Sequence, residues 1–252
     1  MNTTNELEIK RYIELSERSY QESRCFFTDF LTEAEFSDLL NSEKKLYPCG
    51  LRFFPSEKYA THIMVGFGNT EVLGYEEDFP IDTILVEPKA MKFAENLEHK
   101  DYLGALMNLG IERSAVGDLY VKGKKCALYC KSSLTDLILT EFTKVRHTPV
   151  VAKVIDTIPK EFAPEMSFDS STVQSLRLDS IISRIFKISR EEAKKRIQQE
   201  TVAVNGRFLP DPSYTPHPGD TLTLRGGGKA EFLGSSGETK RKRLKIEWNL
   251  YS

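Results

Sequence analysis

The chain contains 252 residues, of which 40% are hydrophobic and 29% charged, and its formal net charge at pH 7 is −2. This length and composition allow a sizeable core and one domain or several. The first ten residues are polar and acidic with no apolar core, and no later run approaches membrane-spanning length, so the sequence predicts a soluble cytoplasmic protein without membrane contact.

The charges are unevenly distributed along the chain. Residues 176–252 contain fifteen Lys and Arg against nine Asp and Glu, a net charge of +6, whereas the remainder has 20 against 28, a net charge of −8. A basic segment on an acidic body is typical of a protein in which one domain binds nucleic acid. The sequence therefore predicts several domains and argues against nonspecific coating of DNA by the whole chain.

The cysteines give no sign of a metal site. Cys25, Cys49, Cys126 and Cys130 form no C-x-x-C pair and have no histidine at zinc-finger spacing. We therefore expect buried, reduced thiols, no metal and no other cofactor. Cys126 and Cys130 lie four apart in an alternating apolar run, which favours one face of a strand over metal ligation.

Residues 1–78 predict a small α+β module. Residues 6–25 have the pattern of a helix, and Thr32 with Glu35 forms a capping box that opens a second helix. Residues 61–67, which are apolar and small, predict a strand.

Residues 79–158 predict a second unit with the order βαββαβ. This is the ferredoxin-like pattern, which many RNA-recognition domains share with many unrelated proteins. The strands and helices are expected, in chain order, at 83–86, 101–109, two short strands within 118–130, 133–142 and 150–155. The stretch 122–129 only partly fits the signature whose aromatic side chains stack on bases.

Five cations of this unit form a candidate second phosphate surface, namely Lys122, Lys124, Lys125, Lys144 and Arg146. Solvated turn lysines would give the same pattern. The sequence leaves both interpretations open.

Residues 159–172 predict a linker. They contain Pro159, Pro164 and three serines from Ser167 onward, and they show no periodicity. The basic domain that follows, residues 173–252, is therefore expected to move relative to the rest.

The basic domain opens with two short amphipathic helices. Four apolar residues recur at helical spacing on one face of the first, and Arg177 and Arg184 lie together on another. The four are Leu178, Ile181, Ile182 and Ile185. Ser189 and Glu192 form a capping box from which the second helix starts at Arg190.

Three further features follow the helix pair, two of which add cations. Asn205-Gly206 tolerates positive φ at both central positions of a hairpin turn, which would project Arg207 beside the charged helical face. Gly226-Gly227-Gly228 lies between two expected strands, which favours a turn over a phosphate loop, because a phosphate loop must open a helix. Lys240-Arg241-Lys242-Arg243 suits an RNA backbone, with a solvated loop as the alternative.

Cations on a rigid surface bind phosphates by charge and counterion release, which gives affinity without sequence reading. The residues predicted to contact RNA are Arg177, Asp179, Arg184, Ser189, Arg190, Lys194, Lys195, Asn205, Gly206, Arg207, Lys240, Arg241 and Arg243. A solvated basic face on an ordinary helix pair is the alternative.

The order of Arg177-Leu178-Asp179, Ser189-Arg190, Val204-Asn205-Gly206 and Gly219-Asp220 resembles the S-four RNA-binding domain, named after a protein of the small ribosomal subunit. As the resemblance implies, such domains dock a helical pair and the Asn-Gly turn on structured RNA, chiefly through backbone shape.

Five further strings make the whole chain similar to the YlmH family. They are Phe27-Thr28-Asp29-Phe30-Leu31-Thr32, Asp101-Tyr102-Leu103-Gly104-Ala105-Leu106, Leu109-Gly110-Ile111-Glu112-Arg113, Gly117-Asp118-Leu119 and Thr143-Lys144-Val145-Arg146. The family pattern implies an α+β chain with an N-terminal α/β module, a ferredoxin-like middle domain similar to an RNA-recognition motif, and a C-terminal S-four domain. The segment Leu46-Tyr47-Pro48-Cys49-Gly50-Leu51-Arg52 departs from the Gly-Tyr-Pro-Gly-Ala-Glu-Arg-like segment usual in this family.

The resemblance implies a non-enzymatic bacterial RNA-binding factor of ribosome-associated quality control. Its expected partners are rRNA of the large ribosomal subunit, tRNA or peptidyl-tRNA, and other quality-control factors, and its expected role is support of C-terminal tailing of stalled chains. A ribosome-assembly or translation-regulatory factor would use the same residues. An RNA-modifying enzyme of the pseudouridine synthase type is a third hypothesis, because Arg177-Leu178-Asp179 superficially fits its Asp-containing string, although no second catalytic signature occurs upstream.

Overall fold

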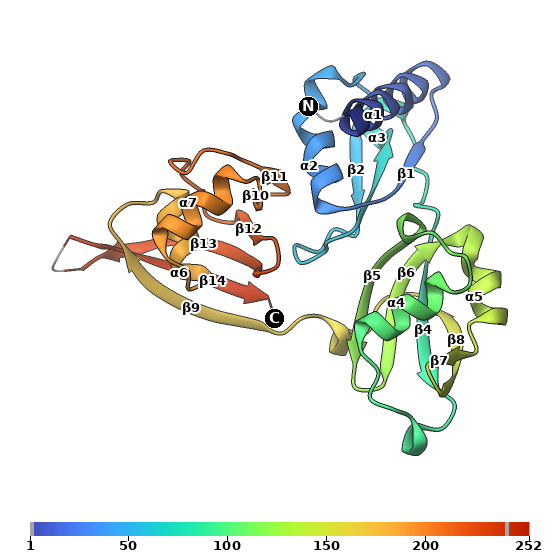
Figure 1. Ribbon diagram of the computed structural model, residues 1–252. Helices are drawn as coiled ribbons and strands as arrows, with labels where there is room; N and C mark the ends of the chain where they lie inside the picture. The colour runs from blue at the N-terminus through green and yellow to red at the C-terminus, as the bar shows by residue number, and fades with distance from the viewer. Residues whose placement is uncertain (1–2, 240–241, 252) are drawn as a thin grey trace.

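The computed structural model describes residues 3–239 and 242–251 (Figure 1). Three separate sheets, of three, five and six strands, mark three units along this part of the chain. The mixture of helices and sheets confirms the α+β class. No helix of the described residues is long and apolar enough to cross a membrane.

The N-terminal module packs helices on a three-stranded sheet of order β1-β3-β2. Its elements are α1 (Thr3–Glu22), β1 (Phe26–Leu31), α2 (Glu33–Asn41), η1 (Glu43–Lys45), β2 (Leu51–Phe54), β3 (Ile63–Phe67) and α3 (Thr70–Leu73). The capping box that opens α2 is confirmed, because the Thr32 side chain accepts from Glu35 N and the Glu35 carboxylate accepts from Thr32 N at 2.8 Å. Tyr12, Leu39 and Phe67 lie in the core.

The middle domain has the expected order βαββαβ with one additional two-residue strand. Its elements are β4 (Ile81–Pro88), η2 (Met91–Phe93), α4 (His99–Met107), η3 (Arg113–Ala115), β5 (Val116–Lys122), β6 (Lys125–Lys131), η4 (Ser132–Leu134), α5 (Thr135–Glu141), β7 (Lys144–Val145) and β8 (Thr148–Ile155). Neighbouring strands of the sheet, β5-β6-β4-β8-β7, are all antiparallel. Tyr102 from α4 and Ile138 from α5 are buried in the same core as Cys126 and Cys130, which lie on one face of β6 as predicted.

The other face of this sheet is covered by the protein itself. Tyr129 packs edge-on against Phe54 of the N-terminal module with 5.0 Å between ring centroids, and Tyr120 packs against Tyr59 at 5.9 Å. Phe162, in the turn η5 (Lys160–Phe162), is 5% exposed and packs on the same face. Tyr120 of the edge strand β5 and Tyr129 of the inner strand β6 therefore pack in an interface within the protein.

The C-terminal domain contains α6 (Leu178–Ile185), α7 (Arg190–Gln198) and a six-stranded antiparallel sheet of order β11-β10-β12-β13-β14-β9. The strands are β9 (Met166–Val173), β10 (Val202–Val204), β11 (Arg207–Phe208), β12 (Thr221–Leu224), β13 (Gly228–Glu238) and β14 (Leu244–Tyr251). Ile181, Ile182 and Trp248 are buried between the helices and the sheet. Gly226 lies in the β12–β13 turn, so the hairpin interpretation of the triple glycine is confirmed.

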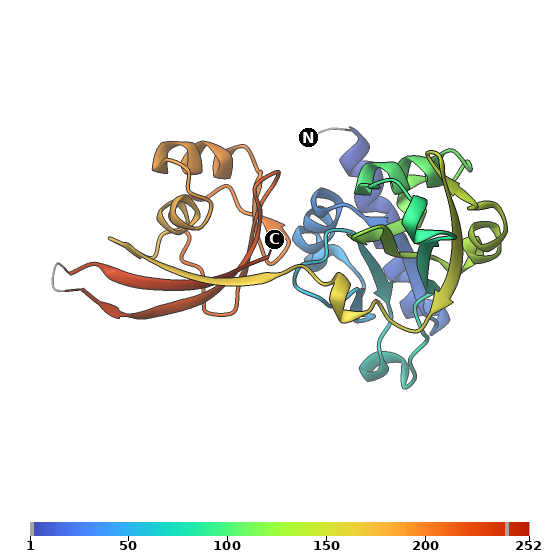
Figure 2. The same cartoon turned by 90° about the horizontal axis from the view of Figure 1, so that it is seen from below.

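The linker prediction is wrong for its second half. Residues 166–173 form β9, which pairs with β14 from Met166–Tyr251 to Val173–Leu244. Figure 2 shows β9 as a long curved strand that leads from the middle domain along the edge of the C-terminal sheet. Its backbone hydrogen bonds make these residues part of the C-terminal domain.

The C-terminal domain also contacts the N-terminal module, which contradicts free movement of the basic domain. Arg207 donates to Leu40 O and to the Glu43 carboxylate, both at 2.7 Å, and Phe208 N donates to Ser37 Oγ at 2.7 Å. The predicted tight turn is present, with φ of 50° at Asn205 and 78° at Gly206. It faces α2.

Two lysines add further contacts between the C-terminal domain and the N-terminal module. Lys58 pairs with Glu231 at 2.5 Å, and Lys229, whose side chain is 13% exposed, donates to Ala60 O and lies 3.4 Å from the Glu33 carboxylate. Burial lowers the pKa of Lys229, against the opposing effect of Glu33. Both lysines thus bind groups of the protein itself.

The tightness of the contact can be tested with two alanine substitutions at glycines of similar backbone conformation. A Cβ at Gly206 would lie 2.7 Å from Phe36 Cε1, whereas one at Gly226, with φ of 75°, would meet nothing within 4 Å. Both Gly206→Ala and Gly226→Ala carry the strain of positive φ, about 1 kcal/mol. Gly206→Ala should additionally lower the urea midpoint of unfolding and expose α2 to protease. Equal losses in the two variants would show that the turn is not packed on α2.

Candidate nucleic-acid interface

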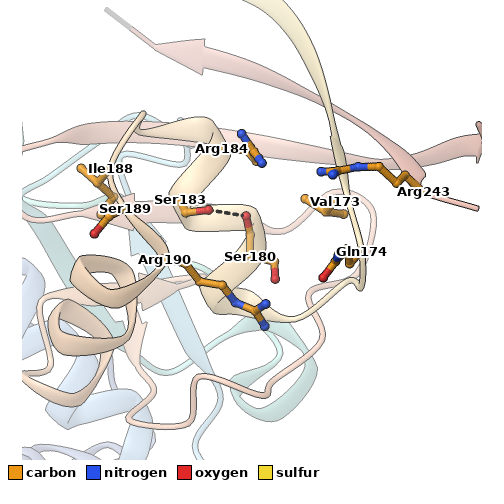
Figure 3. Close-up of a pocket in the computed structure, with 9 residues that line it drawn as sticks. All are labelled: Val173, Gln174, Ser180, Ser183, Arg184, Ile188, Ser189, Arg190 and Arg243. Carbon is orange, nitrogen blue, oxygen red and sulfur yellow. Dashed lines mark hydrogen bonds between the residues drawn. The ribbon is translucent and has the colours of Figure 1, made fainter. Parts of the chain in front are cut away.

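A groove of about 420 Å³ lies where α6 and the start of α7 approach the ends of β9 and β14. Its lining residues are Val173, Gln174, Ser180, Ser183, Arg184, Ile188, Ser189, Arg190 and Arg243. Figure 3 shows three arginines entering the groove from three segments, with the guanidinium groups of Arg184 and Arg243 turned toward each other. None of the described lining residues is acidic, so the groove suits an anion.

Local sequence explains why two of these arginines face the groove. All four apolar residues of the predicted α6 stripe are at most 2% exposed, which leaves Arg184 on the solvent side, where it makes no hydrogen bond or ion pair with the described residues. Helix α7 begins at Arg190 because Ser189 Oγ accepts from Glu192 N at 3.0 Å. The reciprocal half of the predicted capping box is not formed, since the Glu192 carboxylate accepts from Arg196 at 2.7 Å instead.

Asp179 fixes the position of Arg190. Its side chain is 0% exposed, and its carboxylate accepts from Arg190 Nε at 3.1 Å and from Arg177 Nε at 3.2 Å. Burial by itself would raise the pKa of Asp179, but the hydrogen bonds from the two arginines outweigh it and the pKa lies below its ordinary value. Asp179 therefore stays ionised and holds two guanidinium groups in fixed orientations.

The third arginine comes from the β13–β14 hairpin. Arg243 Nη2 donates to Thr172 O of β9 at 2.8 Å, and its Nε is buried without a hydrogen-bond partner among the described residues. The strands β9 and β14, which flank the helix pair, thus add a cation that the helices alone do not supply.

A second hollow of about 360 Å³ shares Ser183, Arg184 and Ile188 with the groove. It is lined by Asp169, Ser170, Ser171, Ser183, Arg184, Lys187, Ile188 and Trp248. Lys187, which was not among the predicted contacts, has φ of 53° in the turn between α6 and α7. The sequence signal for it was a charged residue in the short connection between two predicted helices, which favours an exposed side chain.

The structure separates the other predicted contacts from the groove. Asn205 donates to the Asp220 carboxylate at 2.7 Å and accepts from Thr221 N at 2.8 Å, and it lies with Gly206 and Arg207 at the N-terminal module. Lys194 and Lys195 are exposed on α7 but do not line the groove. Lys240 and Arg241 lie outside the described residues. Within the described ranges no three His, Cys, Asp or Glu side chains are grouped to hold a metal ion.

Two segments of the chain match known family models. Residues 75–158 match the family model described as "Putative RNA-binding domain in YlmH", and residues 176–222 match the "S4 domain", which is the S-four domain of the sequence analysis. The S4 match ends before β13 and β14, so Arg243 lies beyond it.

Individual relatives agree with these matches. The chain is 29% identical over 175 residues to "Ribosome-associated protein quality control protein P2" of Bacillus subtilis (strain 168), covering 68% of this chain and 66% of that protein, just under two thirds of its length. It is 44% identical over 74 residues to small ribosomal subunit protein uS4 of Azoarcus sp., covering 29% of this chain and 35% of that protein. "Cell division protein ylmH from Streptococcus pneumoniae" shares the fold with a TM-score of 0.50 at 15% identity, covering 62% of this chain and 93% of that chain.

The anchoring role of Asp179 predicts a specific pH dependence. Asp179→Asn keeps the shape of the side chain but removes its charge, so we expect the free energy of unfolding at neutral pH to fall by about 1–3 kcal/mol. Because the folded-state pKa is lowered, the carboxylate stabilises the fold above the unfolded pKa of about 4, and this contribution is lost as the pH falls through the folded pKa.

Denaturant unfolding of both proteins across the acidic range measures this difference. The gap between wild type and Asp179→Asn should be constant near neutral pH and should close in acid. A gap that persists unchanged to strongly acidic pH would show that Asp179 does not hold the arginines through its charge.

Proposed function

We propose that this chain, whose residues 75–158 match the model of an RNA-binding domain in YlmH and whose residues 176–222 match the S4 domain, binds RNA on the ribosome through the arginine groove. The observation that carries this proposal is the convergence of Arg184, Arg190 and Arg243 on a groove whose described lining is free of acidic residues. Guanidinium groups match phosphate geometry and lose little freedom on binding when they are already held in place. Such contacts give affinity for an RNA backbone without reading its sequence.

The ribosome is proposed as the site of action because of the relatives. One is named as a ribosome-associated quality-control protein and another as a protein of the small ribosomal subunit. Within that setting we propose that this chain contacts rRNA of the large subunit together with tRNA or peptidyl-tRNA. It would act with other quality-control factors and support the C-terminal tailing of stalled chains by stabilising one placement of the tRNA.

The proposed role is binding rather than catalysis. The Asp of the Arg-Leu-Asp string, on which the modifying-enzyme hypothesis depends, is Asp179, and this carboxylate is completely buried between Arg177 and Arg190. A carboxylate in that position cannot approach a nucleotide without breaking both ion pairs. This observation favours a structural use of Asp179 in the RNA-binding surface.

Charge reversal in the groove tests the proposal. Arg184→Glu combined with Arg190→Glu should weaken co-sedimentation with large ribosomal subunits by roughly a hundredfold or more, since each lost charge-assisted contact is worth about 1.5–3 kcal/mol. The slope of log affinity against log salt concentration should fall by about 2. Arg184→Glu alone leaves the ion pairs of Asp179 intact and should show an intermediate loss.

The matched control changes the same net charge elsewhere. Arg225→Glu combined with Lys45→Glu alters two exposed cations that do not line the groove and should sediment with the subunits like wild type. Unchanged association of the groove variant would reject the proposal. Sequencing of RNA crosslinked to the wild-type protein separates the roles: large-subunit rRNA and tRNA support quality control, whereas precursor rRNA alone favours assembly.

A further inference from the structure

The middle domain matches an RNA-binding family model, yet the sheet face that would offer stacking aromatics is closed by Phe54, Tyr59 and Phe162. If this domain contacts RNA, it must use another surface. The loop between β4 and α4, residues 89–98, provides one. Figure 1 shows this loop at the end of the middle domain that lies away from the N-terminal module.

The loop displays an aromatic side chain. Phe93 is 82% exposed, the highest value among the large exposed hydrophobic residues of the described chain, and Met91 beside it is 47% exposed. Lys92 Nζ lies 5.8 Å from the centroid of the Phe93 ring. An aromatic ring with a cation beside it is the combination that binds an unpaired nucleotide, because the ring stacks on the base and the cation neutralises its phosphate.

The loop is held in a defined conformation. Lys124 Nζ donates to Met91 O at 3.2 Å and to Ala94 O, and Glu95 N donates to Thr148 Oγ1 at 3.1 Å. Leu97 is 3% exposed and anchors the end of the loop in the core. Because the backbone is fixed on both sides of Phe93, little ordering is needed when a base stacks on it.

Further cations border the loop. Lys89 N donates to Pro149 O, and His147 N donates to the Glu95 carboxylate at 3.0 Å, so the loop lies beside the β7–β8 turn that carries Arg146. Lys89 is exposed, and Arg146, 53% exposed, has Nη1 3.9 Å from Asp101 Oδ1.

The five cations of the predicted second phosphate surface do not act together. Lys122 and Lys125 pair with Glu165 and Glu87, and Lys124 holds the loop, which leaves Lys144 and Arg146 near it.

We propose that the middle domain binds single-stranded RNA at this loop, with Phe93 stacked on an unpaired base and Lys89, Lys92 and Arg146 at the flanking phosphates. This inference rests on the proposed function and adds a second RNA contact to it. The groove of the C-terminal domain binds the RNA backbone, whereas the loop binds an unpaired base. The chain thereby selects RNA in which a structured stem adjoins an unpaired segment.

The test uses the full chain and two fluorescein-labelled RNAs, a hairpin with a loop of unpaired uridines and a duplex with the same stem. Phe93→Ala should weaken binding of the hairpin about tenfold, the typical effect of removing one stacking side chain, and leave duplex binding unchanged. Phe93→Trp should bind the hairpin like wild type, and Phe93→Leu should behave like Phe93→Ala. Because Phe93 is exposed, thermal unfolding of all variants should match wild type.

Two outcomes overturn the inference. Unchanged hairpin binding by Phe93→Ala would exclude stacking at this loop, and wild-type hairpin binding by Phe93→Leu would show that the RNA needs only an apolar side chain there and no stacked ring. Arg184→Glu with Arg190→Glu, measured in parallel, should lose both RNAs. If that variant fails to bind while Phe93→Ala binds fully, only the loop is rejected; if the groove variant binds both RNAs like wild type, the proposed function is rejected.

Discussion

The candidate interface depends on one buried carboxylate. Asp179 lies at the start of α6, where Leu178 N and Asp179 N donate to Tyr214 O and Pro212 O, and it binds Arg177 from its own segment and Arg190 from the next helix. A buried charge is tolerated only when it is paired, so Asp179 depends on the two arginines. Asp179 in turn orients both guanidinium groups. This triad links α6 to the start of α7 at the groove, in addition to the core that the two helices share.

The rest of the molecule determines which cations remain available for RNA. Arg207, Lys58 and Lys229 are used in contacts between the C-terminal domain and the N-terminal module, and the tyrosines of the middle sheet are used in packing. The chain has a net charge of −2, yet each of the two proposed sites keeps a cation that pairs with no carboxylate of the described residues. Arg184 is that cation in the groove, and Lys89 and Lys92 are those beside Phe93.

Local patterns in the sequence predict individual helices, caps and turns, but not which elements pack or pair with one another. The helix stripe of α6, the cap at Ser189 and the positive φ of Asn205-Gly206 depend on a few adjacent residues, and all three were predicted correctly. β9 has the sequence pattern of a linker, because it is rich in serine and does not alternate, and its partner strand lies far along the chain. The docking of Arg207 on α2 and the entry of Arg243 into the groove are likewise long-range contacts that no local pattern encodes.

The most direct measurement is a cryo-electron microscopy map of the protein bound to large ribosomal subunits that carry peptidyl-tRNA. We expect RNA phosphates within hydrogen-bonding distance of Arg184, Arg190 and Arg243, with both ion pairs of Asp179 preserved. A complex in which the groove faces solvent, and the protein is held through other surfaces, would show that the groove is not the RNA-binding surface.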